Sequence, residues 1–220
     1  MPLVHHSEMK IKTSTRVWKV VGLILLVCGS LYGQQKGTIT TFDAPGAGAN
    51  LYQGTWPTAI NPARVITGYY LDTNSVYHGF LRSRVGSFTS FDAPGAGNQA
   101  NAYPTQGTQA FSINRALTIV GYYTDTGGIS HCFLRAPNGT FTNIDPPGSV
   151  GSSNQFPIVI DAAGAVVGNF SDQFGSHGFL RTPGGTFISF DPPNSSLTIP
   201  SGTSSKSLLI LASRISAWRR

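Results

Sequence analysis

One ten-residue stretch decides the fold: Gly86-Ser87-Phe88-Thr89-Ser90-Phe91-Asp92-Ala93-Pro94-Gly95. Closely similar stretches occur at residues 37–46, 139–148 and 185–193. The aspartates of the four copies are Asp43, Asp92, Asp145 and Asp191, so successive copies are 49, 53 and 46 residues apart. A period of this length is typical of proteins built from tandem β-sheet repeats.

Other motifs recur between these copies: an isoleucine followed by a short polar residue, a stretch around a glycine, a turn aspartate and a His-x-Phe-Leu-Arg stretch. They are Ile60-Asn61, Ile113-Asn114 and Ile160-Asp161; residues 66–70, 119–123 and 166–170; Asp72, Asp125 and Asp172; and residues 78–82, 131–135 and 177–181. The runs are rich in aromatic and β-branched residues and are bounded by Gly, Pro, Asn and Asp. We therefore predict four short strands in each unit, which in the first unit lie around Ile60 and at residues 66–70, 78–82 and 87–92.

The predicted strands carry adjacent apolar residues instead of a strict alternation, most clearly in Phe80-Leu81, Phe133-Leu134 and Phe179-Leu180. Because neighbouring side chains of a strand point to opposite faces of the sheet, both faces of these strands are expected to be covered. We predict an all-β fold in which tandem four-stranded repeats pack as β-propeller-like blades, with three full units and one extra strand. A β-sandwich is the alternative, although its strands alternate more cleanly.

The combination of these motifs resembles the HAF repeat of extracellular bacterial proteins, which is named for a His-Ala-Phe core. The resemblance extends over residues 37–193, and it implies an extracellular location and a repeat architecture more than an activity. The sequence departs from the pattern at the middle of the core, which holds Gly79, Cys132 and Gly178. It departs again in the third unit, where Asp161 takes the place of the expected asparagine.

Residues 1–33 have the organisation of a secretory signal peptide. A cationic stretch that ends at Lys19 precedes the apolar run Val20–Cys28, and small residues follow up to Gly33. The run is too short for a membrane-spanning helix, which needs about 20 residues. We therefore predict export, with cleavage between about residues 28 and 34, no stable membrane span afterwards, and a secreted or cell-envelope location.

The repeat domain is predicted to span residues 34–193, with units at about 37–85, 86–138 and 139–184 and a partial unit at 185–193. Residues 194–220 contain none of the repeat motifs and are described as an off-pattern C-terminal tail. Closed propellers have four to eight blades. We therefore expect the chain to be a truncated member of a longer repeat family, which forms an incomplete propeller and self-associates.

The net charge of +6 comes from the two ends of the chain. Residues 1–33 contribute +3 and residues 201–220 contribute +4, whereas residues 34–200 hold seven Lys or Arg against eight Asp, or −1. A nucleic-acid-binding surface requires cations clustered on the folded body. This partition argues against a nucleic-acid partner.

Histidine, aspartate and cysteine are the candidates for chemistry. His78, His131 and His177 each begin a strand at the same place in a unit, which favours a hydrogen bond to a neighbouring loop over a metal site. The aspartates favour turn capping over calcium binding, because each loop holds a single carboxylate. Cys132 is the only cysteine after the signal peptide, and we interpret it as a small-residue substitution for glycine.

Catalysis is not expected, because the sequence contains neither Gly-x-Ser-x-Gly nor His-Glu-x-x-His. Asp161 is the one aspartate outside the repeated series, and no second carboxylate accompanies it. We predict no catalytic, cofactor-binding or metal-binding residues and no cofactor. The alternative is a secreted carbohydrate-active enzyme, a glycoside hydrolase or lyase, on a propeller scaffold.

Loop aromatics are the remaining candidates for binding. Tyr52, Trp56, Tyr77 and Tyr103 lie among Gln, Asn and Thr, which suits contact with a glycan or a protein, and packing between units is their alternative role. We predict an exported, non-catalytic scaffold or binding module for a glycan or protein partner.

Overall fold

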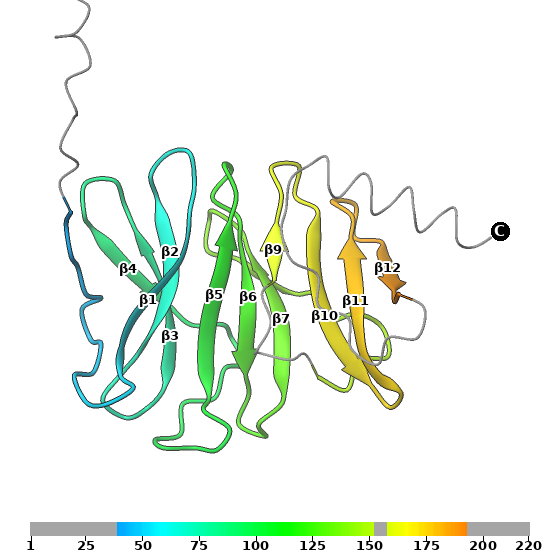
Figure 1. The fold of residues 1–220 in the computed structure, drawn as a ribbon, viewed down its shortest axis with the longest axis horizontal. Coiled ribbons are helices and arrows are strands. Elements are labelled where there is room, and N and C mark those ends of the chain that lie inside the picture. Colours follow the sequence, from blue (N-terminus) through cyan, green and yellow to red (C-terminus); the bar gives the residue numbers. More distant parts are fainter. Residues whose placement is uncertain (1–38, 152–157, 193–220) are drawn as a thin grey trace, which may run out of the picture. The chain divides into compact units, whose positions relative to one another are not determined.

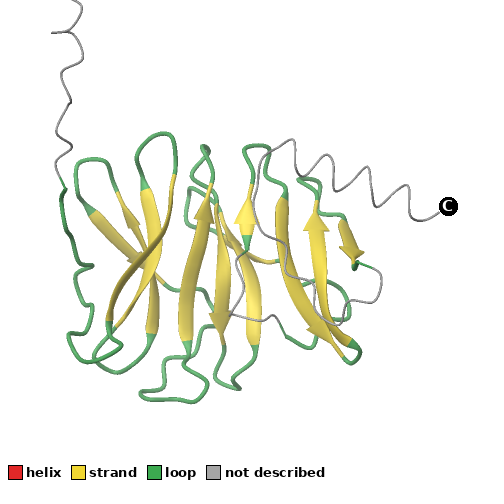
Figure 2. Ribbon diagram, in the orientation of Figure 1, coloured by secondary structure: helices red, strands yellow, loops and turns green. Residues whose placement is uncertain are grey.

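The computed structural model describes residues 39–151 and 158–192. The chain divides into two compact parts, Met1–Thr41 and Phe42–Arg220. The predicted signal peptide and the tail at 194–220 lie outside the described residues. The described residues are all-β, as predicted, and contain no helix (Figures 1 and 2). No segment among them qualifies as a helix that could cross a membrane.

The described residues hold twelve strands in three successive sets of four, and each set is called a unit below. The strands are β1 (Gly54–Ile60), β2 (Ile66–Leu71), β3 (Tyr77–Arg82) and β4 (Phe88–Phe91); β5 (Gly107–Ile113), β6 (Ile119–Thr124), β7 (Ser130–Arg135) and β8 (Phe141–Asn143); and β9 (Val159–Ile160), β10 (Val166–Asp172), β11 (Gly175–Arg181) and β12 (Phe187–Phe190). Within each unit, consecutive strands pair antiparallel. The four strands predicted for each unit are confirmed, and the recurring ten-residue stretch supplies the fourth. The extra strand predicted from the copy at residues 37–46 is wrong for its described part, because residues 39–46 pair with no strand.

The first two units share one eight-stranded sheet, and the third forms a four-stranded sheet of its own. The shared sheet is joined where β3 and β5 run parallel, with Tyr77 opposite Gly107. The Tyr77 amide donates to the Gln106 carbonyl over 2.9 Å. A Cβ atom at Gly107 would lie 2.1 Å from the Tyr77 carbonyl oxygen, and the φ angle of Gly107 is +111°. Only glycine therefore fits at this join.

The strands of each unit run between the same two ends, which differ in charge. β5 runs upward and β6 downward in Figure 1, so the β6–β7 hairpin lies at the lower end. We call this the aspartate end; it carries the β2–β3, β6–β7 and β10–β11 hairpins and the segments that follow β4, β8 and β12. The opposite, arginine end carries the turns that join β1 to β2, β3 to β4 and their equivalents.

A ladder of side-chain hydrogen bonds links the three units at the arginine end. The Nδ2 group of Asn61 donates to the Asn114 carbonyl over 3.1 Å, and the Nδ2 group of Asn114 donates to the Asp161 carbonyl over 3.3 Å. All three residues are buried. Each side-chain oxygen also accepts a backbone amide four residues later in its own turn, so each residue closes a turn and the two asparagines also join one unit to the next.

Both faces of the central strands are covered, as the adjacent apolar pairs predict. Phe80 is fully buried against Ala44 and Tyr70, whereas its neighbour Leu81 packs on the other face against the apolar cluster that contains Phe133. Leu134 in turn packs against a cluster that contains residues of the second and third units. The apolar core therefore lies between consecutive units.

Candidate functional site

Each unit holds its histidine between two aspartates at the aspartate end, an arrangement we call an Asp–His–Asp clamp. In the second unit, Nδ1 of His131 lies 2.7 Å from Oδ2 of Asp145, and Nε2 lies 3.5 Å from Oδ2 of Asp125. The same two distances are 3.0 and 3.6 Å for His78 with Asp92 and Asp72, and 2.7 and 3.0 Å for His177 with Asp191 and Asp172. The structure therefore brings together three residue series that the sequence presented separately.

The antiparallel hairpins place these residues together. In the first unit, Gly79 on β3 pairs with Phe91 on β4, so His78 and Asp92 follow at the next position of the ladder. The histidine and its strand-end aspartate are 14 residues apart in all three units. That constant separation is the signal from which sequence reasoning could have found the clamps.

The hairpin aspartate of each clamp also caps its own turn, which confirms the predicted capping role. Oδ1 of Asp125 accepts the amides of Gly127 and Ile129, both over 2.8 Å. Oδ1 of Asp72 accepts the amides of Asn74 and Val76, both over 2.9 Å. Because Oδ1 is occupied by the backbone, in these two units Oδ2 is the oxygen that faces the histidine.

The clamp contacts shift the pKa values of two histidines and two aspartates toward the charged forms. The hydrogen bond to Asp92 raises the pKa of His78, and the hydrogen bond to Asp191 raises the pKa of His177, in both cases against the opposing effect of burial. The Phe174 amide and His177 lower the pKa of Asp172. Burial opposes the shift of Asp125, but the Ile129 amide and His131 together lower its pKa. In the first and third units the clamp thus favours the imidazolium form of its histidine.

An aromatic ring lies against the histidine of each clamp. Tyr123 stacks on His131 with ring centroids 4.9 Å apart, Tyr70 stacks on His78 at 5.1 Å, and the ring of Phe170 lies tilted 5.3 Å from that of His177. Two carboxylates fix the imidazole, and the imidazole supports the ring. The clamp therefore holds one aromatic side chain of each unit in a set orientation.

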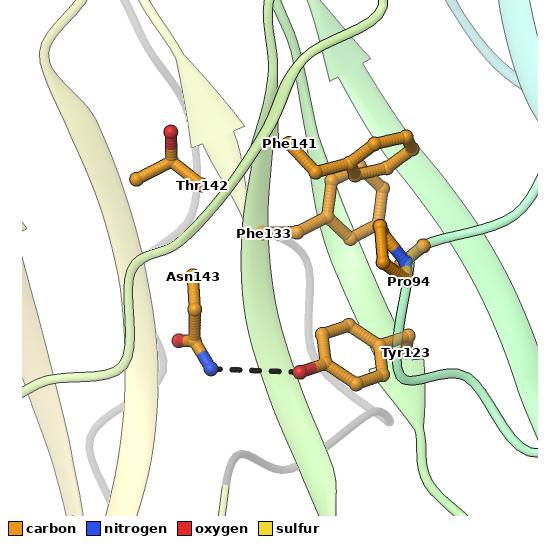
Figure 3. A pocket seen from close by; sticks show the side chains of 7 residues that line it. Pro94, Tyr123, Phe133, Phe141, Thr142 and Asn143 are labelled. Atoms are coloured by element: carbon orange, nitrogen blue, oxygen red, sulfur yellow. Dashed lines mark hydrogen bonds between the residues drawn. The ribbon is translucent and has the colours of Figure 1, made fainter.

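Tyr123 forms one wall of a small pocket at the join between the first and second units (Figure 3). The pocket has a volume of about 150 Å³. It is lined by the rings of Tyr123, Phe133 and Phe141, by Pro94 from the loop that enters the second unit, and by Thr142 and Asn143. Nδ2 of Asn143 donates to the Tyr123 hydroxyl over 3.5 Å. The pocket thus combines apolar walls with a polar rim, as ligand sites do.

An equivalent pocket of about 170 Å³ lies at the join between the second and third units. Pro147, Phe170, Phe179, Phe187 and Ser189 stand there at the positions of Pro94, Tyr123, Phe133, Phe141 and Asn143. A hollow of about 150 Å³ accommodates one six-membered ring. The joins between units therefore offer at least two equivalent ring-sized pockets.

The four loop aromatics of the sequence analysis divide into two pairs. Trp56 stacks on Tyr69 at 5.6 Å, and Tyr77 meets the same ring edge-on at 5.4 Å, so these two rings pack within the first unit. Tyr52 and Tyr103 are exposed, and both lie on loops that enter the first strand of a unit at the aspartate end. Most other exposed large apolar side chains outside residues 39–41 also lie at this end: Leu51, Ile129, Val150 and Phe174.

Asp161 lies apart from the clamps, at the arginine end. It is buried, and its Oδ1 accepts the Ala165 amide over 2.8 Å, as Asn61 and Asn114 do for their turns. This is the geometry of a turn cap. Asp161, which stands where the other two units have asparagine, therefore has a structural role.

Among residues 39–151 and 158–192, no group of three or more His, Cys, Asp or Glu side chains is arranged to hold a metal ion. Comparison of the chain with family models, with curated proteins and with solved structures found no match.

Proposed function

We propose that this chain is an exported, non-catalytic β-repeat scaffold that binds a glycan or protein partner. The observation that carries the proposal is the recurrence of an aromatic, ring-sized pocket at two successive joins between units. Equivalent sites on a rigid scaffold suit a ligand that itself repeats, because the second contact forms at high effective concentration once the first is made.

In this proposal the units are blades of a propeller. The four-stranded antiparallel meander, the apolar clusters between consecutive units and the asparagine ladder all support that arrangement. The burial of adjacent residues such as Phe179 and Leu180 argues against a sandwich, whose outer faces meet solvent.

A glycan is the ligand that best suits the pockets. The aromatic walls complement the C–H face of a sugar ring, and Asn143 or Ser189 at the rim offers hydrogen bonds to its hydroxyl groups. The exposed rings of Tyr52 and Tyr103 lie at the same end of the sheets and extend the surface beyond the pockets. Export is proposed from residues 1–33, which lie outside the described residues. N-terminal sequencing of the extracellular protein tests it.

We propose that the aspartate carboxylates have structural and not catalytic roles. Six of the eight aspartates among residues 39–151 and 158–192 belong to the clamps, and Asp161 caps a turn. A panel of polysaccharide hydrolysis assays tests this assignment. Turnover that Asp161→Asn abolishes would instead identify a carbohydrate-active enzyme.

A glycan array with the purified chain tests binding directly. We expect selective binding to a set of related glycans, which is lost when both pockets are filled by Asn143→Trp and Ser189→Trp. Both positions are exposed, so the larger side chains leave the core intact. The matched control is Val85→Trp, an exposed position at the arginine end, which should bind as the parent does. Equal binding by the pocket-filled variant would refute the pockets as the site.

A further inference from the structure

The arginines and aspartates of the described residues lie at opposite ends of the sheets. Strand directions place all six arginines at the turns of the arginine end: Arg64, Arg82, Arg84, Arg115, Arg135 and Arg181. Seven of the eight aspartates lie at the aspartate end, and Asp161 is the exception. The described residues therefore have a small net charge but gather their arginines at one end. The sum of charges along the sequence could not show this separation.

The arginines have no carboxylate counterions in the described part of the chain. Every ion pair found there joins a histidine to an aspartate. Burial lowers the pKa of Arg135, and the Nε atoms of Arg82 and Arg135 are buried without a hydrogen-bond partner among the described residues. A partly desolvated cation without a counterion is costly, and a bound anion would offset that cost.

Three arginines, one from each unit, are held in position by aromatic rings. The guanidinium of Arg82 lies 4.6 Å from the ring centroid of Phe42, and that of Arg135 lies 4.6 Å from the ring centroid of Phe91. A second ring lies farther away, Phe88 at 5.7 Å from Arg82 and Phe141 at 5.9 Å from Arg135. Arg181 has this second contact alone, with Phe187 at 5.9 Å, because Ile144 stands where the other units have Phe42 and Phe91. Stacking covers the face of a guanidinium and leaves its edges for hydrogen bonds. Because Nε is buried in Arg82 and Arg135, the edge formed by the two Nη groups is the one that would bind a carboxylate, sulfate or phosphate in a bidentate manner.

We propose that the arginine end binds an acidic polysaccharide. An arginine beside an aromatic ring recurs once per unit, and Arg64, Arg84 and Arg115 are exposed at the same end, so the cations form a series that suits anions repeated along a chain. A lipid surface fits less well, since the large apolar side chains exposed among the described residues of this end are only Ile60 and Val85. A single nucleic-acid strand requires free aromatic faces, and the guanidinium groups cover those of Phe42 and Phe91.

The test measures binding of the full chain to polygalacturonate and to its fully methyl-esterified form, which has the same backbone without the charge. We expect binding to the acidic polymer alone, weakened by added salt. The variant Arg64→Gln/Arg84→Gln/Arg115→Gln should weaken it about tenfold, because it removes three exposed cations that each contribute modestly. The pocket-filled variant described above should bind the acidic polymer as the parent does, which separates this surface from the proposed glycan pockets.

The matched control lowers the net charge by the same three units at the aspartate end, through Thr73→Glu, Asn98→Asp and Gln173→Glu, all at exposed positions. This variant should keep most of its affinity for the acidic polymer. Thermal unfolding of both triple variants establishes that each is folded. Equal loss in the two variants, unchanged binding in the arginine variant, or equal binding of the esterified polymer would each overturn the proposal. Tighter binding to single-stranded DNA or to anionic lipid vesicles would overturn the assignment to a polysaccharide.

Discussion

The middle position of the His-x-Phe core shows how a single residue follows its cross-strand partner. Gly79 lies opposite Phe91, and a Cβ atom at Gly79 would come within 2.4 Å of that ring. In the second unit, Ile144 stands at the position of Phe91, and Cys132 is tolerated opposite it. The sequence predicted that Cys132 replaces a glycine, but its compensating partner became visible only with the register of the strands.

We expect Gly79→Cys to lower the free energy of unfolding by about 1–3 kcal/mol, the usual cost of overpacking. Adding Phe91→Ile should restore part of that loss, because the smaller side chain makes the room that the second unit already has. Urea unfolding of both single variants and the double variant gives the coupling energy. Strictly additive effects would contradict the compensation.

Backbone conformation at Arg64 provides a second test at this scale. Arg64 has a φ angle of +61°, whereas the equivalent position in the third unit is Gly164, with a φ of +92°. Left-handed geometry strains a residue with a Cβ atom, so Arg64→Gly should raise the free energy of unfolding by about 0.5 kcal/mol after the entropy cost of glycine. Ala63→Gly in the same turn is the control, and it should destabilise the chain because Ala63 has no positive φ.

At the scale of elements, the hairpins of the repeat explain the clamps. The sequence predicted that the hairpin aspartates cap turns, and it predicted that the histidines bond to neighbouring loops. It did not predict that both aspartate series meet at one imidazole, because that follows from the pairing of β3 with β4 and from the reach of the β2–β3 hairpin. The repeat in the sequence thus predicts the strands and turns, whereas the clamps depend on the register in which the strands pair.

The clamps predict a maximum in stability at mildly acidic pH. The raised pKa values of His78 and His177 mean that their contribution is complete below the unfolded pKa near 6.5, and it is lost as the pH rises through the folded values. The pKa values of Asp125 and Asp172 are lowered. Their contribution to the free energy of unfolding is therefore complete above the unfolded pKa near 3.8, and it is lost as the pH falls through the folded values.

Chemical denaturation across pH 3 to 9 should therefore give the highest free energy of unfolding at about pH 5, between those windows. The double variant His78→Gln/His177→Gln should lose the decline on the alkaline side and keep the one on the acidic side. A flat profile for the parent, or an unchanged alkaline decline in the variant, would show that the clamps do not govern the pH dependence.

At the scale of the whole molecule, the all-β class and the division into four-stranded units could be predicted, because both follow from the period and from adjacent apolar pairs such as Phe133-Leu134. The charge separation could not be seen in a sum over residues 34–200. It depends on which end of a strand each side chain occupies, and that requires the direction of every strand. The pockets were missed for the same reason, since Pro94 and Phe141 meet only across a join between units.

The asparagine ladder predicts which substitutions uncouple the units. Asn114→Asp removes the donor to the Asp161 carbonyl in a buried place, and we expect a loss of about 1–3 kcal/mol in the free energy of unfolding. Asp161→Asn keeps the oxygen that accepts the Ala165 amide, so it should cost clearly less. Thermal unfolding of the two variants makes the comparison, and an equal effect would contradict a directional ladder.

The ladder also determines how such a chain can be lengthened. An asparagine side chain both donates and accepts a hydrogen bond, whereas the side chain of Asp161 accepts the Ala165 amide and has no amide group to donate. If the second unit were duplicated and inserted before the third, the side chain of the new Asn114 equivalent could donate to the Asp161 carbonyl. Its own backbone carbonyl could accept from the side chain of Asn114 in the preceding unit. The same duplicate placed after the third would follow a residue that has nothing to donate. An asparagine at this position can therefore link its unit to a following one, and an aspartate cannot. A designer who wants to add units after the third must replace Asp161 first.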